Sequence, residues 1–347
     1  MFFSGSSANN LIEQDIEQLI ARFFALPANT VKTWLKFEAK TLHITLPFAA
    51  HTQHKLLHDN LMAALNEHQN SIRQINISTL IEAAPTQVDR RARIKNIIAV
   101  ASGKGGVGKS ATSVNLAFAL LAEGAKVGLL DADIYGPSVP IMLGNAKAKP
   151  STQDQQRVEP MNTNGLVASS IAYFVPAENA TVWRGPMASK ALLQLLNETN
   201  WPELDYLIVD MPPGTGDIQL TLAQQIPVSA AVIVTTPQDL ALADATKGIA
   251  MFNKVNVPVL GLVENMSYHI CSQCGHHEAI FSEHGGQKLA KQYNVPLLGQ
   301  IPLNIAIRQH ADSGTPLQLS QPAHPLSLAY QELARETSRA LYLKSIK

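Results

Sequence analysis

The run of glycines and lysines at residues 103–110 has the residue types and spacing of a phosphate-binding loop. It matches the pattern G-x-x-x-x-G-K-[ST], follows an apolar stretch typical of a buried strand, and opens a helical pattern. Glycines let successive backbone N–H groups turn inward, and the helix N-terminus adds its positive dipole end, so the loop would bind the phosphates of a nucleotide. We expect Lys109 to reach the β and γ phosphates and the Ser110 hydroxyl to bind Mg²⁺. The predicted nucleotide-binding residues of the loop are Gly103, Lys104, Gly105, Gly106, Val107, Gly108, Lys109 and Ser110.

Carboxylates follow two other apolar runs. Residues 127–130 lead into Asp131 and Asp133, and residues 206–209 lead into Asp210, which is followed by MPPGTGD. A carboxylate at the end of a buried strand near a phosphate loop can hold Mg²⁺ through water, and Asp210 is the better candidate for that role. For Asp131, a structural role in capping a helix or a turn is the competing interpretation.

The chain has two cysteines, Cys271 and Cys274, and they form one C-x-x-C pair. Iron–sulfur clusters and structural zinc both need about four such ligands. A four-thiolate site therefore requires two chains, each giving its pair. Three interpretations stay open: a redox dithiol, a zinc site completed within the chain by His276 or His277, and an iron–sulfur cluster shared between subunits. The dithiol is disfavoured because such pairs open a helix, whereas this pair lies in a His-rich loop.

The elements that must position these residues follow from the hydrophobic pattern. From residue 96 onward, short apolar runs alternate with helical stretches. Continuous apolar runs predict strands buried on both faces, so we expect an α/β fold with a doubly wound, mostly parallel sheet. Ligands of such sheets bind at the carboxyl ends of the strands. The expected strands are residues 97–101, 127–130, 206–209, 231–235, 259–263 and 296–298.

The first part of the chain has a different pattern. Residues 1–82 combine two helical patterns with two alternating stretches, which predicts a small α+β domain. Residues 83–95 are polar, with a proline and a basic cluster, and predict a linker. Residues 96–347 would then form the P-loop domain that carries the C-x-x-C pair.

Composition excludes other classes. The 347 residues carry 27 basic and 27 acidic side chains, so no net charge draws the chain to nucleic acid or anionic lipid. The first residues lack the pattern of a secretory signal, and no apolar run approaches the ~20 residues of a membrane span. We expect a cytoplasmic protein with neither a nucleic acid nor a membrane as its partner.

The loop sequence KGGVGKS resembles the deviant Walker A loop of the MinD and nitrogenase iron-protein branch of P-loop ATPases. The resemblance implies that Lys104 reaches across a homodimer interface to the partner's nucleotide, which ties catalysis to dimerisation. Asp133 resembles the switch I carboxylate that orients the attacking water. Ala111, the next nucleotide-binding position, stands where most such loops carry Thr, so a hydroxyl contact near the α phosphate is missing.

Four further segments extend the resemblance to one family. They are WRGPMASKALLQLL (183–196), DYLIVDMPPGTGD (205–217), VTTPQDLALADATKGIAMF (234–252) and LGLVENMSYHICSQCG (260–275). With the phosphate loop, they look like the Mrp/ApbC family of iron–sulfur cluster carrier ATPases. The family implies an ATP-binding homodimer that hydrolyses ATP slowly, holds a [4Fe–4S] cluster between its subunits and passes it to client apoproteins. By this resemblance Cys271 and Cys274 are the cluster ligands, and Asn265 contacts adenine.

Other functions remain open at this point. The alternative is a MinD/ParA-like positioning ATPase with a structural zinc at the C-x-x-C pair. Membrane recruitment would need a basic amphipathic tail, whereas the C-terminal helical pattern mixes Glu and Arg on its polar face. An electron-transferring reductase ranks below the carrier, because the cluster cysteines of the nitrogenase iron protein lie far apart in sequence. Client, donor and the step that hydrolysis gates are not specified by the sequence.

Overall fold

The computed structural model describes residues 6–67, 71–85, 93–152, 157–175, 184–271 and 273–346. The chain divides into two compact units, with the boundary between Ile81 and Glu82. Trp183 and Ser272, which belong to the family-like segments, lie outside the described residues. In the described part of the chain, no helix is both long enough and apolar enough to cross a membrane.

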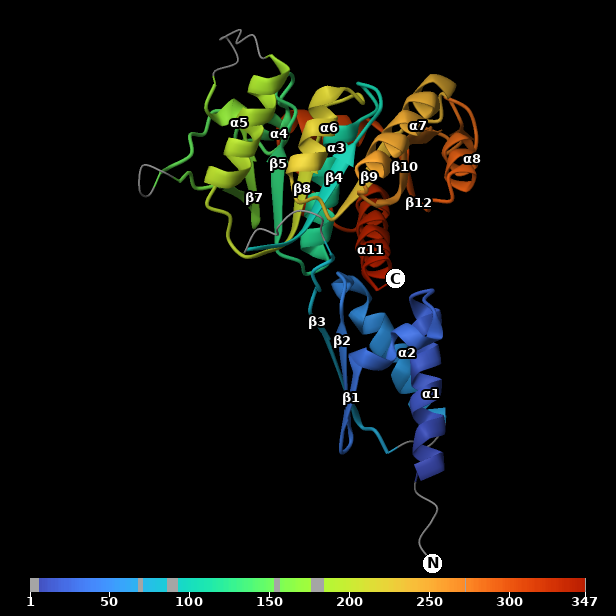
Figure 1. Cartoon of the computed structure of the whole chain (residues 1–347). Coiled ribbons are helices and arrows are strands. Elements are labelled where there is room, and N and C mark those ends of the chain that lie inside the picture. The colour runs from blue at the N-terminus through green and yellow to red at the C-terminus, as the bar shows by residue number, and fades with distance from the viewer. Residues whose placement is uncertain are drawn as a thin grey trace, which may run out of the picture. The chain divides into compact units, whose positions relative to one another are not determined.

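The first unit is a three-stranded sheet with helices on one face (Figure 1). Its middle strand β2 pairs antiparallel with β1 and parallel with β3. The alternation in β2 buries Leu42, Ile44 and Leu46 completely, as a sheet with one covered face requires. The elements are α1 (Ser6–Phe23), η1 (Ala28–Thr30), η2 (Lys32–Trp34), β1 (Leu35–Glu38), β2 (Thr41–Leu46), η3 (His51–Gln53), α2 (His54–Glu67) and β3 (Gln74–Thr79).

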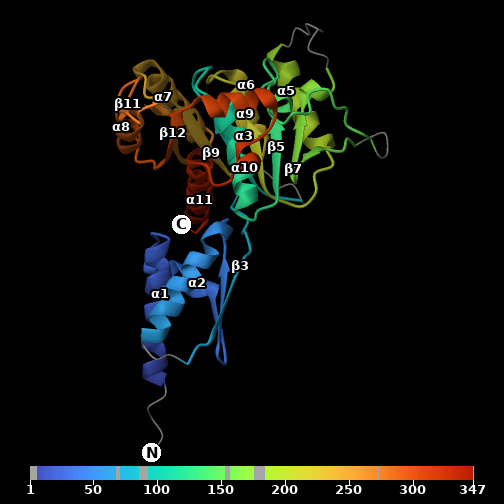
Figure 2. The same ribbon diagram turned by 180° about the vertical axis from the view of Figure 1, so that it is seen from behind.

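The second unit is a nine-stranded sheet with helices on both faces. The strand order is β11-β10-β9-β4-β8-β5-β7-β6, and β12 also pairs with β10. The pairings of β6 with β7 and of β10 with β11 are antiparallel, and the others are parallel. Helices α5, α6 and α7 cover the face seen in Figure 1, and α3, α9, α10 and α11 cover the face seen in Figure 2. The prediction of a doubly wound, mostly parallel α/β domain is confirmed.

The bounds of these elements follow. The strands are β4 (Ile94–Ala101), β5 (Val127–Asp131), β6 (Met161–Thr163), β7 (Leu166–Ser170), β8 (Leu204–Asp210), β9 (Ala230–Thr235), β10 (Val259–Ile270), β11 (His277–Glu278) and β12 (Leu297–Leu303). The helices are α3 (Lys109–Ala122), α4 (Val139–Met142), η4 (Ile171–Tyr173), α5 (Gly185–Glu198), α6 (Asp217–Gln225), α7 (Asp239–Lys254), α8 (Gly285–Gln292), α9 (Ile305–Ser313), α10 (Leu317–Ser320) and α11 (Pro325–Ser345).

Strand β4 begins earlier than the sequence pattern suggested. Its first two residues, Ile94 and Lys95, lie inside the stretch predicted as linker. Ile94 is buried, and the Lys95 ammonium donates to Asp205 at 2.7 Å, so both belong to the sheet. The side-chain amide of Asn96 donates to the carbonyl of Glu82 at 2.8 Å and so holds that backbone against the second unit.

Candidate functional site

The phosphate loop lies between the central strand β4 and helix α3, as its sequence context predicted. Gly106 and Gly108 both have φ near +81°, a left-handed conformation that glycine adopts without strain. A Cβ at Gly103 would lie 2.1 Å from the carbonyl oxygen of Asp244, so α7 packs directly on the loop. The loop is therefore shaped by contacts within one chain.

A buried cluster joins Lys109 to Asp210. The Lys109 ammonium lies 2.7 Å from Asp210 Oδ1 and 3.2 Å from the Ser110 hydroxyl oxygen. The Ser113 hydroxyl, one turn further along α3, also donates to Asp210 Oδ1 at 2.7 Å. The side chain of Lys109 is 6% exposed and that of Asp210 is 0% exposed. The structure thus brings together three residues predicted to act at one site, Lys109, Ser110 and Asp210.

The second oxygen of Asp210 makes these residues suitable for Mg²⁺. Asp210 Oδ2 is buried and has no hydrogen-bond partner among the described atoms. An orphaned buried carboxylate oxygen is costly unless a ligand satisfies it. A hydroxyl oxygen, that of Ser110, lies close by, and hard oxygen ligands of this kind are what Mg²⁺ prefers. The donor set therefore fits the predicted magnesium site.

Asp131 lies at the carboxyl end of β5 and is fully buried. Its Oδ2 accepts hydrogen bonds from the Val139 backbone N–H at 3.2 Å and from the Ser170 hydroxyl at 3.0 Å. Burial, together with the nearby Asp210 carboxylate, raises the pKa of Asp131. Asp131 thereby ties β5, β7 and the start of α4 together, which is the structural role that the sequence left open.

Asp133 is more accessible than Asp131. Its backbone N–H donates to Asp131 Oδ1, and its own carboxylate accepts from the Gly136 N–H, each at 3.3 Å. Partial burial is the largest influence on the Asp133 carboxyl and raises its pKa, while the Lys109 charge acts in the opposite direction. Asp133 therefore lies in the electrostatic field of the buried cluster, on a loop that Asp131 holds.

Lys104 lies on the phosphate loop, and Ala111 lies in the first turn of α3. Lys104 is exposed, and within the described residues no ion pair includes it. Its backbone carbonyl accepts from the Ser102 hydroxyl at 2.9 Å, so its backbone is fixed while its side chain faces solvent. Ala111 is half-buried, and its carbonyl accepts from the Asn115 side chain at 2.8 Å.

Asn265 touches the phosphate loop directly. Its side-chain amide donates to the Val107 carbonyl at 2.8 Å, and a Cβ at Gly108 would lie only 2.1 Å from the same nitrogen. The residue is 6% exposed. In this structure Asn265 therefore supports the loop backbone, and its predicted contact with adenine stays a prediction.

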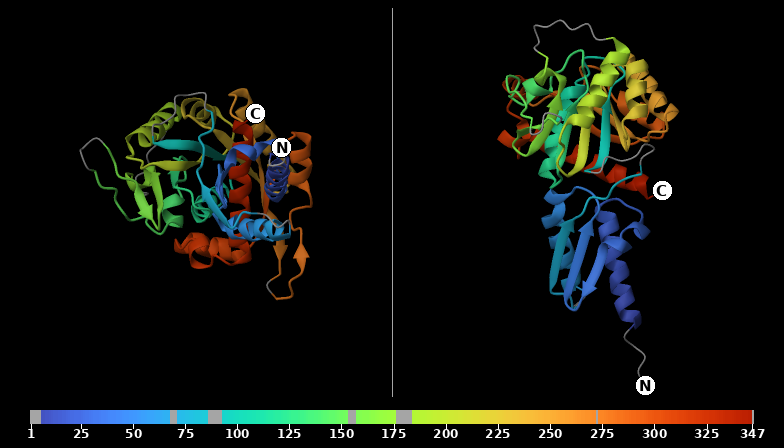
Figure 3. Two further views of the ribbon diagram at one scale, coloured as in Figure 1. Left: turned by 90° about the horizontal axis from the view of Figure 1, so that it is seen from below. Right: turned by 60° about the vertical axis from the view of Figure 1, so that its left-hand side comes forward.

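The cysteine pair lies at the tip of a β-hairpin. Strand β10 continues to Ile270 instead of ending near Asn265, and it pairs antiparallel with β11. The Cys271 N–H donates to the His276 carbonyl, and the Gly275 N–H donates to the Cys271 carbonyl, each at 2.9 Å. Gly275 has φ +72°, which lets the chain turn at this point. The hairpin protrudes from the second unit, in orange in the left view of Figure 3.

The hairpin favours the thiolate form of Cys271. Both cysteines are free thiols, Cys271 half-buried and Cys274 exposed. Backbone N–H groups of Cys274 and Gln273 point at the Cys271 sulfur and, with the Cys274 side chain, lower the pKa of Cys271. A thiolate is the form that binds metals. The described residues 268–271 and 273–278 are called the cysteine hairpin below.

The neighbouring histidines do not complete a site in this conformation. His277 stacks its ring on that of Tyr268, with the ring centres 5.7 Å apart. Across the residues that the structure describes, no group of three or more His, Cys, Asp or Glu side chains is arranged to hold a metal ion. Cys271 lies six residues along the chain beyond Asn265, which contacts the phosphate loop.

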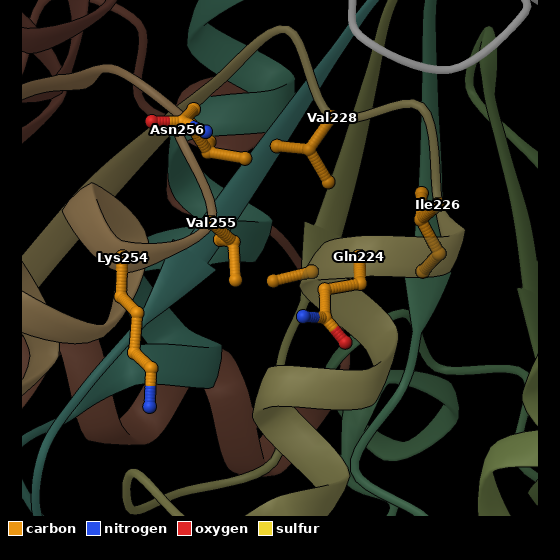
Figure 4. A pocket seen from close by; sticks show the side chains of 8 residues that line it. Gln224, Ile226, Val228, Lys254, Val255 and Asn256 are labelled. Atoms are coloured by element: carbon orange, nitrogen blue, oxygen red, sulfur yellow. The ribbon is translucent and has the colours of Figure 1, made fainter.

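One cavity of the second unit lies away from the phosphate loop. It has a volume of about 320 Å³, and its lining includes Gln224, Lys254 and Asn256 (Figure 4). Its residues end α6 and α7 and precede β9 and β10, so it lies at the amino ends of those strands. The phosphate loop follows the carboxyl end of β4, and the cavity is therefore at the opposite edge of the parallel sheet.

Ser113 was missed in the sequence, although a signal was present. It lies four residues after Lys109 on α3, so both side chains face the same side of the helix. A small hydroxyl residue on the buried face of an otherwise apolar helix needs a hydrogen-bond partner. Asp210 is that partner.

A phosphate loop between a central parallel strand and a helix, with a buried lysine–carboxylate pair beneath it, defines a P-loop nucleotide-binding protein. Comparison with known proteins specifies the class further. The ParA family model described as NUBPL iron-transfer P-loop NTPase matches residues 93–338, and the chain belongs to this family. The resemblance seen in the sequence is thereby confirmed.

Several known proteins are similar to this chain over 72–78% of its length. The iron-sulfur cluster carrier protein of Salmonella typhimurium is 64% identical over 249 residues, which cover 72% of this chain and 68% of that protein. That of Pseudomonas fragi is 56% identical over 78% of this chain and 94% of its own length. The mouse iron-sulfur cluster transfer protein NUBPL is 49% identical over 72% of this chain and 78% of its own length.

Two solved structures show the fold. A nucleotide-binding protein from Archaeoglobus fulgidus, in complex with ADP, superposes with a TM-score of 0.58 and 38% identity, covering 64% of this chain and 88% of that chain. The cell division ATPase MinD of Pyrococcus furiosus superposes with a TM-score of 0.53 at 22% identity, covering 70% of this chain and 98% of that chain. The second likeness concerns the fold alone.

Proposed function

We propose that the protein is an ATP-binding carrier that holds a [4Fe–4S] cluster between the cysteine pairs of two subunits and transfers it to client apoproteins. The observation that carries the proposal is the cysteine hairpin, which protrudes from the second unit (Figure 3) and carries the two thiols of the chain, with Cys274 exposed and Cys271 half-buried. The cluster needs about four thiolates. The names of relatives up to 64% identical support the same cargo.

At the nucleotide site each residue has a proposed task. Lys109 binds the β and γ phosphates, and the loop N–H groups orient them. The Ser110 hydroxyl and the free oxygen of Asp210 hold Mg²⁺, which supplies charge neutralisation to the phosphates. Asp133 orients the attacking water, and Lys104 reaches the nucleotide of the partner subunit. Hydrolysis is slow, because the site is complete only in the homodimer.

The decisive experiment is anaerobic reconstitution of the purified chain with iron and sulfide. We expect about four iron and four sulfide per dimer, since each chain gives two thiolates. Iron, sulfide and zinc are quantified together with the mass of the particle in solution. A monomer that holds stoichiometric zinc would instead support the positioning ATPase with a structural zinc.

A further inference from the structure

Strand β10 connects the two sites of the second unit. Near its middle, Asn265 donates to the Val107 carbonyl of the phosphate loop at 2.8 Å, and its side chain fills the space in front of Gly108. Its last residue, Ile270, directly precedes Cys271. A change in the loop backbone at Val107 or Gly108 therefore reaches β10 without an intermediate residue.

Between these two points β10 is irregular. In its pairing with β12, Asn265 lies opposite Ile301 and His269 lies opposite Leu303, so four steps along β10 correspond to two along β12. Met266, inside this segment, has φ +54° although it is not a glycine. Such a backbone conformation persists only where the surroundings enforce it. The bulge at residues 266–268 therefore depends on the side chains that surround it.

A buried hydrogen-bond cluster holds the bulge. Glu264 is 1% exposed, and its Oε1 accepts from the Ser267 hydroxyl at 2.6 Å and from the Gln300 side-chain amide at 2.8 Å. The same amide lies 3.1 Å from the Ser267 hydroxyl oxygen, and Glu264 Oε2 accepts from the Gly286 N–H. We call Glu264, Ser267, Gln300 and Gly286 the bulge clamp. It fastens the bulge to β12 and to the start of α8.

We propose that β10 couples the two sites, so that nucleotide at the phosphate loop changes the placement and metal affinity of the cysteine hairpin, with the bulge clamp transmitting the change. The inference rests on the proposed function in taking the cysteine pair as the metal site. Nucleotide phosphates bind the loop N–H groups, whose peptide units include the carbonyl that Asn265 holds. Coupling of this kind is reciprocal, so metal at the hairpin must change nucleotide affinity by the same factor.

Ser267 and Gln300 are the residues that test the idea. Asn265 contacts the phosphate loop, and changing it would alter nucleotide binding directly. Ser267 and Gln300 are positioning residues, because their described hydrogen bonds go to the bulge clamp and to neither site. Gln300 is an exposed residue, so Gln300→Leu is compatible with folding, and Ser267→Ala is the milder second variant.

The experiment measures a ratio that loss of stability alone would not move. Co²⁺ is titrated into the reduced, metal-free protein with and without ADP and Mg²⁺, and its thiolate absorption gives the apparent Kd. The Kd of ADP is then measured with and without Co²⁺. We expect both ratios to be about fivefold or more in the wild type, which is the lower range of allosteric coupling. In Ser267→Ala and Gln300→Leu both ratios should fall below about twofold.

Matched controls remove similar groups elsewhere. Ser169→Ala deletes a buried hydroxyl on β7 that hydrogen-bonds to Thr199, and β7 is separated from β10 by four other strands of the sheet. Gln194→Leu deletes an exposed glutamine on α5 that hydrogen-bonds to Glu198. Both controls should keep the wild-type ratio. A wild-type ratio near one would overturn the coupling, and clamp variants that keep the full ratio would overturn the role of the clamp.

A second readout separates this inference from the proposed function. The alkylation rate of Cys271 is measured in the Cys274→Ala background with and without ADP, in the absence of any metal. A nucleotide-dependent rate supports the coupling even if reconstitution yields no cluster, in which case only the carrier function fails. If the wild-type chain reconstitutes a cluster but nucleotide leaves the alkylation rate of Cys271 in the Cys274→Ala background unchanged, the coupling is overturned and the carrier function stays intact.

Discussion

The phosphate loop and the cysteine hairpin are built in opposite ways. At the loop, Lys109 is 6% exposed, Asp210 is fully buried, and α7 and Asn265 pack against glycines. At the hairpin, Cys274 is exposed, and the groups that favour thiolate at Cys271 are local N–H donors. One chain therefore preorganises its nucleotide site, while the cysteine hairpin presents two thiols at its tip. This difference agrees with the proposal that a second subunit completes the cysteine site.

Removal of one thiol is the strongest test of this difference between the two sites. Cys271→Ser or Cys274→Ser should abolish cluster binding, because a dimer would then offer only two of about four thiolates. The Kd of ADP in metal-free protein should stay within about twofold, since no described hydrogen bond joins the pair to the loop. Iron content and calorimetry measure the two effects. His277→Ala is the control and should retain the cluster; its loss would support a zinc-type site that includes histidine.

The nucleotide site of one chain is expected to need Lys104 from the other chain, and mixed dimers test this expectation. Lys104→Ala and Asp133→Ala homodimers should hydrolyse ATP poorly. In a mixed dimer, one site combines an intact Asp133 with an intact Lys104 from the other chain, so about half of the native activity per dimer should return. ATP hydrolysis is followed after a tagged pull-down confirms mixing. Action of Lys104 within its own chain predicts no restoration.

The burial of the Lys109–Asp210 ion pair predicts a loss of stability when one of the two charges is removed. Lys109→Met leaves the Asp210 carboxylate buried without a cation, and should lower the free energy of unfolding of nucleotide-free protein by about 3–5 kcal/mol. Chemical denaturation measures the change. The double variant Lys109→Met with Asp210→Asn should recover most of it, because no buried charge remains. Equal losses in the single and double variants would show that packing, and not charge, dominates.

Two glycines of the loop offer a smaller and closely matched contrast. A Cβ at Gly103 would lie 2.1 Å from the Asp244 carbonyl oxygen, whereas a Cβ at Gly105 meets nothing within 4 Å. Gly103→Ala should therefore cost about 1–3 kcal/mol of unfolding free energy, as overpacking does. Gly105→Ala should stay within about 0.5 kcal/mol. Denaturant midpoints of the nucleotide-free variants decide, and similar values for both would contradict the close approach of α7.

The smallest effect concerns the hairpin thiol. The lowered pKa of Cys271 means that its thiolate persists to lower pH than that of an ordinary cysteine. In Cys274→Ala, which keeps the backbone N–H donor, the alkylation rate of Cys271 should rise at lower pH than in the same chain in denaturant. Iodoacetamide rates across pH measure the displacement. Coincident profiles would mean that the folded hairpin does not stabilise the thiolate.

The sequence predicted the central strands because they are continuously apolar. Strands β5, β8 and β9 lie within two residues of the expected runs. Strand β10 was predicted only to Val263, since the residues that follow are polar. They belong to a strand because tertiary partners satisfy them: Glu264 accepts a hydrogen bond from Gln300 on β12, and Asn265 donates one to the phosphate loop. No local pattern contains those partners.

The nucleotide site, like the fold, was predicted in part from the sequence. The P-loop pattern and the strand-end aspartate foretold that Lys109, Ser110 and Asp210 would lie together, because carboxyl ends of parallel strands share one edge of the sheet. The sequence could not show that Asp210 keeps one oxygen free, or that Asp131 is occupied by Val139 and Ser170. Those facts depend on side-chain geometry across distant segments. The assignments to Cys271, Cys274, Lys104 and Asp133 stay predictions.

The strand order has a consequence for the newly made chain. The strand before the phosphate loop, β4, pairs with β8 and β9, and Val107 is held by a residue 158 positions further along the chain. At ordinary synthesis rates that interval corresponds to about 8–30 s, during which the loop has emerged without its neighbours. The cysteine pair leaves the ribosome later still. A nascent chain thus exposes its two thiols only when the strands that shape its nucleotide site are already available for folding.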